Sequence, residues 1–146
     1  MFDKIGNCYY LIPFMWSDYT EVLKEIFSFG ISKGLDSFKL RFTHPTDFLK
    51  ANQQLSKIVT EKGIEDSEKR IPGYDFWIGK MNKESINLLA LQKWRTIGFY
   101  SLEIFGENNS KLIQSIDSNE LCLQKFSDSE IRELEIRLTK WQVKTE

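Results

Sequence analysis

The residues most able to do chemistry in this sequence are one histidine and two cysteines, types that often serve as base and nucleophile. His44 stands three residues before Asp47, and with Cys8 or Cys122 it could form a Cys-His-Asp arrangement that activates a thiolate. A histidine directly before a helix more often lies at the helix start or on the surface. The cysteines lack CxxC or zinc-binding spacing, so we expect reduced thiols and no catalytic residues.

Other kinds of chemical site have little support in the sequence. HExxH, EF-hand and paired-cysteine motifs are absent, and the residues around Gly79 lack the spacing of a phosphate-binding loop, so we expect no metal and no cofactor. Ile64–Gly73 is rich in charge, and acids in such a segment are usually solvated. A small cytoplasmic enzyme that uses Glu68, Asp75 or His44 beside this segment is the first alternative function.

Aromatic residues next to cations suggest a second alternative. Lys80 and Lys83 follow Trp77 closely, and Trp94 lies between Lys93 and Arg95. Such groups could stack on the bases of single-stranded nucleic acid and hold its phosphates. The formal net charge is only −1, however, and nucleic-acid binders gain most affinity from clustered basic residues. We therefore expect no direct contact with nucleic acid.

The clearest asymmetry of charge lies near the C-terminus. Residues 117–135 hold six acids and two bases, a net charge of −4 that leaves +3 on the rest of the chain. If the last strand and the last helix share a face, the acids form a negative surface with an apolar anchor. The alternative is a solvated face whose acids complement the helix dipole. The candidate partner-binding residues are Asp117, Glu120, Asp128, Glu130, Glu133 and Ile136.

A sheet centred on Trp94–Phe126 is expected to position these residues. Its first strand is rich in β-branched and aromatic residues on both parities, which is typical of a central strand covered on both faces. The polar run Gly106–Ser110 predicts a hairpin, and Gly98 can mark a bulge. The segment therefore predicts a meander of three antiparallel strands: Arg95–Phe105, Lys111–Asp117 and Leu121–Phe126.

Further strands are predicted from apolar runs and from apolar–polar alternation. Pro13 places the first of them at a sheet edge or a bulge, because proline cannot donate to a strand ladder. The second alternates with Lys39 and Arg41, which indicates one solvent-facing side. The expected strands are Cys8–Trp16, Phe38–Phe42 and Tyr74–Ile78, and Ile64–Gly73 is expected to be an exposed loop.

Helices are predicted where capping residues precede apolar residues with a 3.6-residue period. Asp18 with Glu21, and Ser127 with Glu130, have the spacing of a capping box, and Asn82 can cap another helix. Ile136 lies opposite the apolar stripe of the last helix. The expected helices run from Asp18 to about Phe29, from Pro45 to Lys62, from Lys83 to about Lys93 and from Ser127 towards Trp141.

At 146 residues, the chain is expected to form a single domain, residues 1–146, of the α+β class. We expect an antiparallel sheet of about five or six strands, including the C-terminal meander, with three or four helices packed mainly on one face. No apolar run is long enough to span a bilayer, and the first residues do not resemble a secretory signal. A cytoplasmic location without membrane contact is therefore expected.

For function, the absence of a catalytic or metal-binding pattern favours a non-enzymatic protein-binding module. The high ratio of lysine to arginine indicates an AT-rich bacterial coding sequence. Our specific hypothesis is a bacterial immunity protein or antitoxin, which neutralises a cognate toxin domain by direct stoichiometric binding. A basic toxin or nuclease domain is the expected partner, because an acidic surface would attract it and apolar contacts would hold it.

Overall fold

The computed structural model describes residues 1–65, 74–95, 98–108, 110–116 and 121–143. Its strands are β1 (Phe2–Ile5), β2 (Cys8–Leu11), β3 (Ser37–Phe42), β4 (Glu61–Glu65), β5 (Tyr74–Lys80), β6 (Phe99–Phe105), β7 (Leu112–Ile116) and β8 (Cys122–Gln124). Its helices are α1 (Tyr19–Ser32), α2 (Pro45–Ala51), α3 (Gln53–Ile58), α4 (Lys83–Ala90) and α5 (Asp128–Leu138), and the 3-10 turn η1 (Thr139–Trp141) follows α5.

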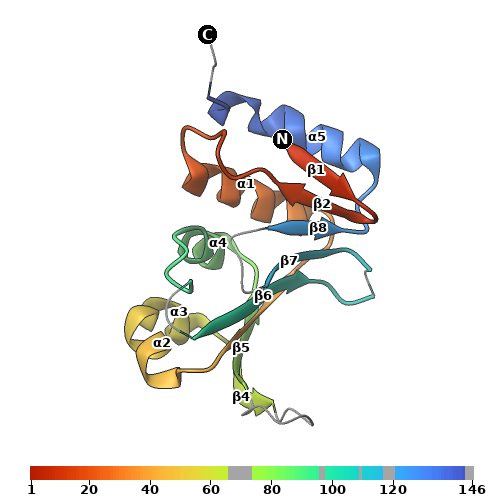
Figure 1. The fold of residues 1–146 in the computed structure, drawn as a ribbon. Helices are drawn as coiled ribbons and strands as arrows, with labels where there is room; N and C mark the ends of the chain where they lie inside the picture. Colours follow the sequence, from red (N-terminus) through yellow and green to blue (C-terminus); the bar gives the residue numbers. More distant parts are fainter. Residues whose placement is uncertain (66–73, 96–97, 109, 117–120, 144–146) are drawn as a thin grey trace.

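The described strands form one antiparallel sheet in the order β1-β2-β8-β7-β6-β3-β5-β4 (Figure 1). The α+β class and the antiparallel sheet are thus confirmed. The predicted numbers were too low, because the described residues form eight strands and five α-helices. The two additional strands are the edge strands β1 and β4. The additional helix arises because the helix predicted over residues 45–62 is divided into α2 and α3.

Three helices begin where the sequence predicts. Asp18 caps α1 by accepting a hydrogen bond from the backbone N–H of Glu21 at 3.2 Å. Asn82 caps α4, and α5 starts with the predicted capping box of Ser127 and Glu130. Such side chains satisfy N–H groups that have no partner inside the helix. These starts are therefore fixed by local chemistry.

The predicted meander is confirmed, since β6, β7 and β8 follow one another in both the chain and the sheet. Ile113 lies opposite Ile104 on one side and Leu123 on the other, and all three side chains are buried. Cross-strand contacts of this kind stabilise a sheet and hold its register. The strands are shorter than predicted: β6 begins at Phe99 and β8 ends at Gln124.

A β-bulge lies near the start of β6. Phe42 pairs with Phe99, whereas Arg41 pairs with Ser101, so β6 has one residue more than β3 at this point. The bulge follows Gly98, whose φ of +90° is a conformation that glycine adopts at little cost. The prediction of a bulge at this glycine is therefore confirmed to within two residues.

The strand predicted over residues 8–16 is shorter, because β2 ends at Leu11 and Pro13 lies in the turn that follows. β1, which was not predicted, pairs with the outer side of β2. Three of the four residues of β1 are exposed, so the strand has no apolar alternation that could reveal it. β1 forms through its hydrogen bonds to β2, and the sequence pattern does not reveal this pairing.

The prediction of one helix over residues 45–62 was wrong in its second half, because this helix does not continue to Lys62. It is interrupted at Asn52, between α2 and α3, and the chain becomes the edge strand β4 at Glu61. β4 consists largely of exposed side chains and pairs only with β5. The predicted loop over 64–73 therefore starts inside a strand, and residues 66–73 lie outside the described part. α4 likewise ends at Ala90, before the predicted Lys93.

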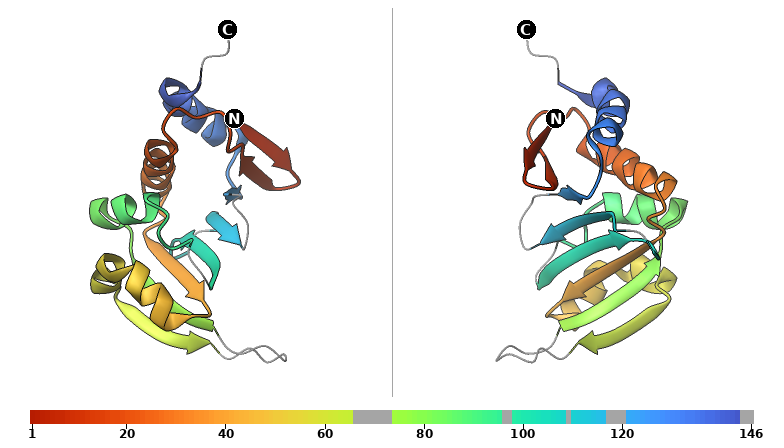
Figure 2. Two further views of the ribbon diagram at one scale, coloured as in Figure 1. Left: turned by 60° about the vertical axis from the view of Figure 1, so that its left-hand side comes forward. Right: turned by 90° about the vertical axis from the view of Figure 1, so that its right-hand side faces the viewer.

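Helices α1 to α4 lie on one face of the sheet (Figure 2). The strand register places alternate side chains on that face, where they form the core. No helix of the described residues covers the opposite face, which we call the open face. β6 lies between β7 and β3, so its predicted central position is confirmed. It presents Ser101 and Glu103 to the open face, so the prediction that both faces of this strand are covered was wrong. The helix-covered core includes Phe38, Leu40, Trp77, Leu102, Ile104, Ile113 and Leu123.

None of the helices in the described ranges combines the length and apolar character needed to cross a bilayer.

Candidate functional site

The predicted partner-binding residues lie mainly on α5. Asp128, Glu130 and Glu133 belong to its first half, while Asp117 and Glu120 lie outside the described residues. Ile136 is 72% exposed, which agrees with its predicted position opposite the apolar stripe. The structure therefore presents an apolar side chain on the same helix as the acids.

Two local features fix the orientation of α5. The hydroxyl of Ser127 accepts from the Glu130 N–H at 3.1 Å, and the Ser127 N–H donates to Glu130 Oε1 at 2.9 Å. The stripe of Ile131, Leu134 and Leu138 is buried in the core. Because successive helical residues are rotated by about 100°, burying this stripe turns the residues between its members outwards.

Cations lie next to the exposed acids of α5. Lys4 Nζ is 3.0 Å from Asp128 Oδ1. Glu133 lies 3.5 Å from Lys33 and 3.1 Å from Arg137. Exposed pairs of this kind contribute little stability, but they reduce the local negative potential. The surface is therefore less negative than the net charge of the sequence segment predicts.

Glu130 is more enclosed than the other two acids. Its carboxylate lies 3.7 Å from Lys111 and 3.9 Å from Lys33, and it also accepts from the Ser127 N–H. Burial acts to raise the pKa of the Glu130 carboxyl, but the hydrogen bonds from Ser127 and the two lysines outweigh it and lower the pKa. Glu130 is thus ionised, and its structural role is to hold the start of α5.

Two apolar residues that sequence reasoning missed lie at the C-terminal end of α5. Phe14 is 94% exposed and Val143 is 47% exposed. The N–H of Val143 donates to the carbonyl of Met15 at 2.8 Å, and Trp16 pairs with Gln142 in an antiparallel bridge. Phe14 was expected inside a buried strand, and Pro13 beside it is the signal that could have indicated an exposed turn.

We call the outer side of α5, together with these two residues, the α5 surface. It comprises Asp128, Glu133, Ile136, Phe14 and Val143. The turn before α1 and the C-terminal end of α5 lie at the same end of the molecule (Figures 1 and 2). An exposed apolar group beside charged pairs resembles the anatomy of protein interfaces, which have an apolar centre and a polar rim.

The Cys-His-Asp arrangement is not formed. The register of β2 and β8 pairs Cys8 with Gln124 and Tyr10 with Cys122, so the two cysteines are diagonal neighbours on the open face. His44 lies at the start of α2, on the helix-covered side. Burial, reinforced by the nearby Cys8, raises the pKa of the Cys122 thiol to about 12. A nucleophilic cysteine needs a lowered pKa, so the shift at Cys122 is in the opposite direction.

The structure describes two of the three residues proposed for a small enzyme, His44 and Asp75. His44 is the residue before α2, and Asp75 lies opposite Phe42 in the β3–β5 ladder. Glu68 lies outside the described residues. Within the described part, no hydrogen bond or ion pair joins the side chains of His44 and Asp75. Nor do these ranges contain a group of three or more His, Cys, Asp or Glu that could hold a metal ion.

The two tryptophans of the nucleic-acid alternative are core residues. Trp77 is 5% exposed and Trp94 is 1% exposed. Cations of the protein itself lie over both rings, with Lys62 Nζ 5.3 Å from the Trp77 ring centre and Arg95 4.5 Å from that of Trp94. A ring that is already covered cannot stack on a base, so this hypothesis loses the residues on which it was based.

The open face of the sheet holds a partly buried ion-pair cluster. Arg41 donates from Nε to Glu65 Oε2 at 3.0 Å and also bonds Glu103, while Lys39 bonds Glu65. The hydrogen bond from Lys39 lowers the pKa of the Glu65 carboxyl, burial opposes it, and the bonds from Arg41 lower it further. Two cations and two acids balance one another here, so the cluster is suited to joining β3, β4 and β6.

Comparisons of the chain with protein-family models, with curated proteins and with solved structures find no match. The function is therefore inferred from the surface and its chemistry.

Proposed function

We propose that this protein is a stoichiometric protein-binding module and that the α5 surface contacts its partner. The observation that carries the proposal is the group of exposed apolar side chains at one end of the molecule, Phe14, Ile136 and Val143. Large apolar side chains are favourable in contact with a partner and unfavourable in water. Such residues act as anchors when a partner supplies a complementary pocket.

The framework beneath these residues supports the proposal. α5 is capped at its start and buried along its inner stripe, and residues 142–143 are tied to the turn before α1. A surface that is already ordered loses little conformational entropy on binding. The anchors are thus presented in a fixed arrangement before the partner arrives.

Within this class, we propose an immunity protein or antitoxin that neutralises a toxin by covering its surface. The acids of α5 support a basic partner, since Asp128 and Glu133 are exposed and their cations could be exchanged for those of the partner. Asp117 and Glu120 belong to the same proposal. Because lysines already pair with the described acids, the apolar anchors are expected to supply most of the affinity.

A matched pair of substitutions tests the proposed interface. Ile136 and Ile64 are 72% and 70% exposed, and Ile64 lies in β4 at the other end of the molecule. The tagged wild type is used to capture its partner from the source lysate, and the purified pair is then studied by calorimetry. Ile136→Asp should weaken binding at least about 30-fold, since an anchor contributes at least about 2 kcal/mol, whereas Ile64→Asp should bind as the wild type does.

The proposal fails if both aspartate variants bind the captured protein equally well, or if no protein is recovered in a stoichiometric amount. A basic toxin domain whose activity is blocked by the wild type, and restored by Ile136→Asp, would support the finer proposal. A captured protein without toxic activity would support binding by the α5 surface and would contradict the assignment as an immunity protein.

A further inference from the structure

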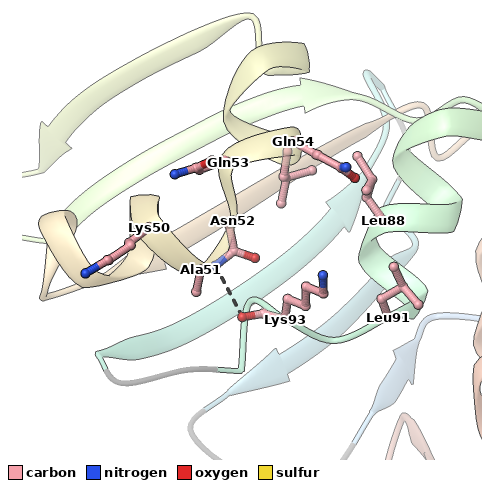
Figure 3. Close-up of a pocket in the computed structure, with 9 residues that line it drawn as sticks. Lys50, Ala51, Asn52, Gln53, Gln54, Leu88, Leu91 and Lys93 are labelled. Carbon is pink, nitrogen blue, oxygen red and sulfur yellow. Dashed lines mark hydrogen bonds between the residues drawn. The ribbon is translucent and has the colours of Figure 1, made fainter.

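A pocket of about 210 Å³ lies between the α2–α3 pair and α4, at the end of the molecule opposite α5 (Figures 1 and 3). The residues that face it include Asn52, Gln54, Leu88, Leu91 and Lys93. None of the described residues that line it has a carboxylate side chain. The pocket is therefore polar on one side, apolar on the other and without an acid to repel an anion.

Asn52 is the key residue of the pocket, and it is only 5% exposed. Its side-chain Nδ2 donates to the Phe48 carbonyl at 3.0 Å and to the Lys93 carbonyl at 3.2 Å, which ties α2 to the segment after α4. The Asn52 carbonyl accepts from the Ser56 N–H at 3.0 Å. Both hydrogens of the amide are thus used, and they fix which end of the amide is nitrogen.

The other end of this amide has no partner. Asn52 Oδ1 accepts no hydrogen bond from any residue that the structure describes, although the side chain is almost fully buried. Figure 3 shows the oxygen pointing away from the helix, into the space in front of Leu88 and Leu91. A buried acceptor without a donor is unfavourable, so this oxygen is a binding point for an N–H or O–H group that enters the pocket.

The neighbouring side chains indicate the remaining chemistry of the ligand. The ammonium of Lys93 points towards the same space, while that of Lys50 points away from it (Figure 3). Leu88 and Leu91 form the apolar wall, and the amide of Gln54 lies at the rim. One inward-facing cation suits a ligand with a single negative charge.

We propose that this pocket binds a small carboxylic acid with an N–H donor beside a short apolar chain. The N–H would donate to Asn52 Oδ1, the carboxylate would pair with Lys93, and the apolar chain would contact Leu88 and Leu91. The pocket is smaller than the roughly 300–1,000 Å³ of most ligand sites, which limits the ligand to the size of an acylated amino acid. The site does not depend on the proposed α5 interface.

N-acetyl-L-leucine is the probe for the first experiment, because it carries the donor, the anion and the apolar chain. In a ¹H–¹⁵N NMR titration of the full chain, we expect saturable shifts confined to α2, α3, α4 and the segment after α4. A ligand of this size is expected to bind with a Kd of about 1 mM. N-acetyl-N-methyl-L-leucine lacks the N–H and should bind at least about tenfold more weakly, since it leaves Oδ1 without a donor.

Two lysine variants separate a specific site from a general effect of charge. Lys93→Gln keeps the backbone carbonyl that holds Asn52 and should bind the probe about tenfold more weakly. Lys50→Gln removes the same charge from a side chain that points away, and it should bind within about twofold of the wild type. The absence of saturable shifts overturns the proposal. Equal binding of the N-methyl compound also overturns it, since Oδ1 would then receive no hydrogen bond from the ligand. Equal affinity of the two lysine variants overturns it as well, since Lys93 would then not pair with the carboxylate.

Discussion

Gly106 lies directly against the backbone of Gly34, so that a Cβ on Gly106 would be 2.0 Å from the Gly34 carbonyl oxygen. This contact joins the end of β6 to the turn that follows α1. A backbone atom cannot move aside as a side-chain end can, and a larger residue must separate the two elements. We expect Gly106→Ala to lower the free energy of unfolding by about 3 kcal/mol, measured by urea denaturation.

Gly6→Ala is the matched control for this substitution. Gly6 has a φ of +60°, but nothing lies within 4 Å of a Cβ placed there. Its alanine variant therefore experiences backbone strain without a clash, and it should lose only about 1 kcal/mol. Equal losses in the two variants would show that the contact between Gly106 and Gly34 is not close.

The helix start at Ser127 gives a second prediction. Ser127→Ala removes the acceptor for the Glu130 N–H and should lower the free energy of unfolding by about 1 kcal/mol. Ser127→Asp restores an acceptor at the same position and should retain most of the wild-type stability. If both variants lost the same amount, the capping hydrogen bond would not be the source of the effect.

A third prediction concerns stability at acid pH. The pKa of Glu65 is lowered in the folded state by its bonds to Lys39 and Arg41. Its contribution to stability is therefore complete above the pKa of the unfolded chain and is lost as the pH falls through the lower folded pKa. The wild type should lose more stability than Glu65→Gln when thermal unfolding is compared at pH 6 and at about pH 3. Parallel losses would contradict this assignment.

The cysteine pair gives a fourth prediction. Burial raises the pKa of the Cys122 thiol to about 12, so almost none of it is ionised to the thiolate at pH 8. Cys8 is partly exposed. In the folded protein, Cys8→Ser, which retains Cys122, should therefore react with a thiol reagent at least about tenfold more slowly than Cys122→Ser. In denaturant the two rates should become equal, and equal rates before denaturation would refute burial as the cause.

The surface around α5 is less negative than the sequence predicts, because basic residues from other elements lie beside its acids. Residues 117–135 predict a strongly negative surface. Lys4, Lys33 and Lys111 come from distant parts of the chain and pair with the acids of α5 in the folded protein. The sign of a surface depends on all neighbours in space, and sequence spacing reveals only those on the same element.

The features that could be predicted from the sequence are local. Asp18, Asn82 and Ser127 fix helix starts because a side chain can reach an N–H only two or three residues away. The outward position of Ile136 likewise follows from the 3.6-residue period of the helix.

The edge strands, the open face of the sheet, the exposure of Phe14 and the pocket at Asn52 depend on tertiary contacts. β1 and β4 exist through hydrogen bonds to a neighbouring strand, and such bonds leave no apolar pattern in the sequence. Phe14 is exposed because the chain leaves the sheet after β2. Asn52 Nδ2 donates to the Phe48 carbonyl, one helical turn earlier, and to the distant Lys93 carbonyl, so that its Oδ1 has no donor among the described residues. Each of these features depends on which distant residues meet, which packing and pairing across the whole chain determine.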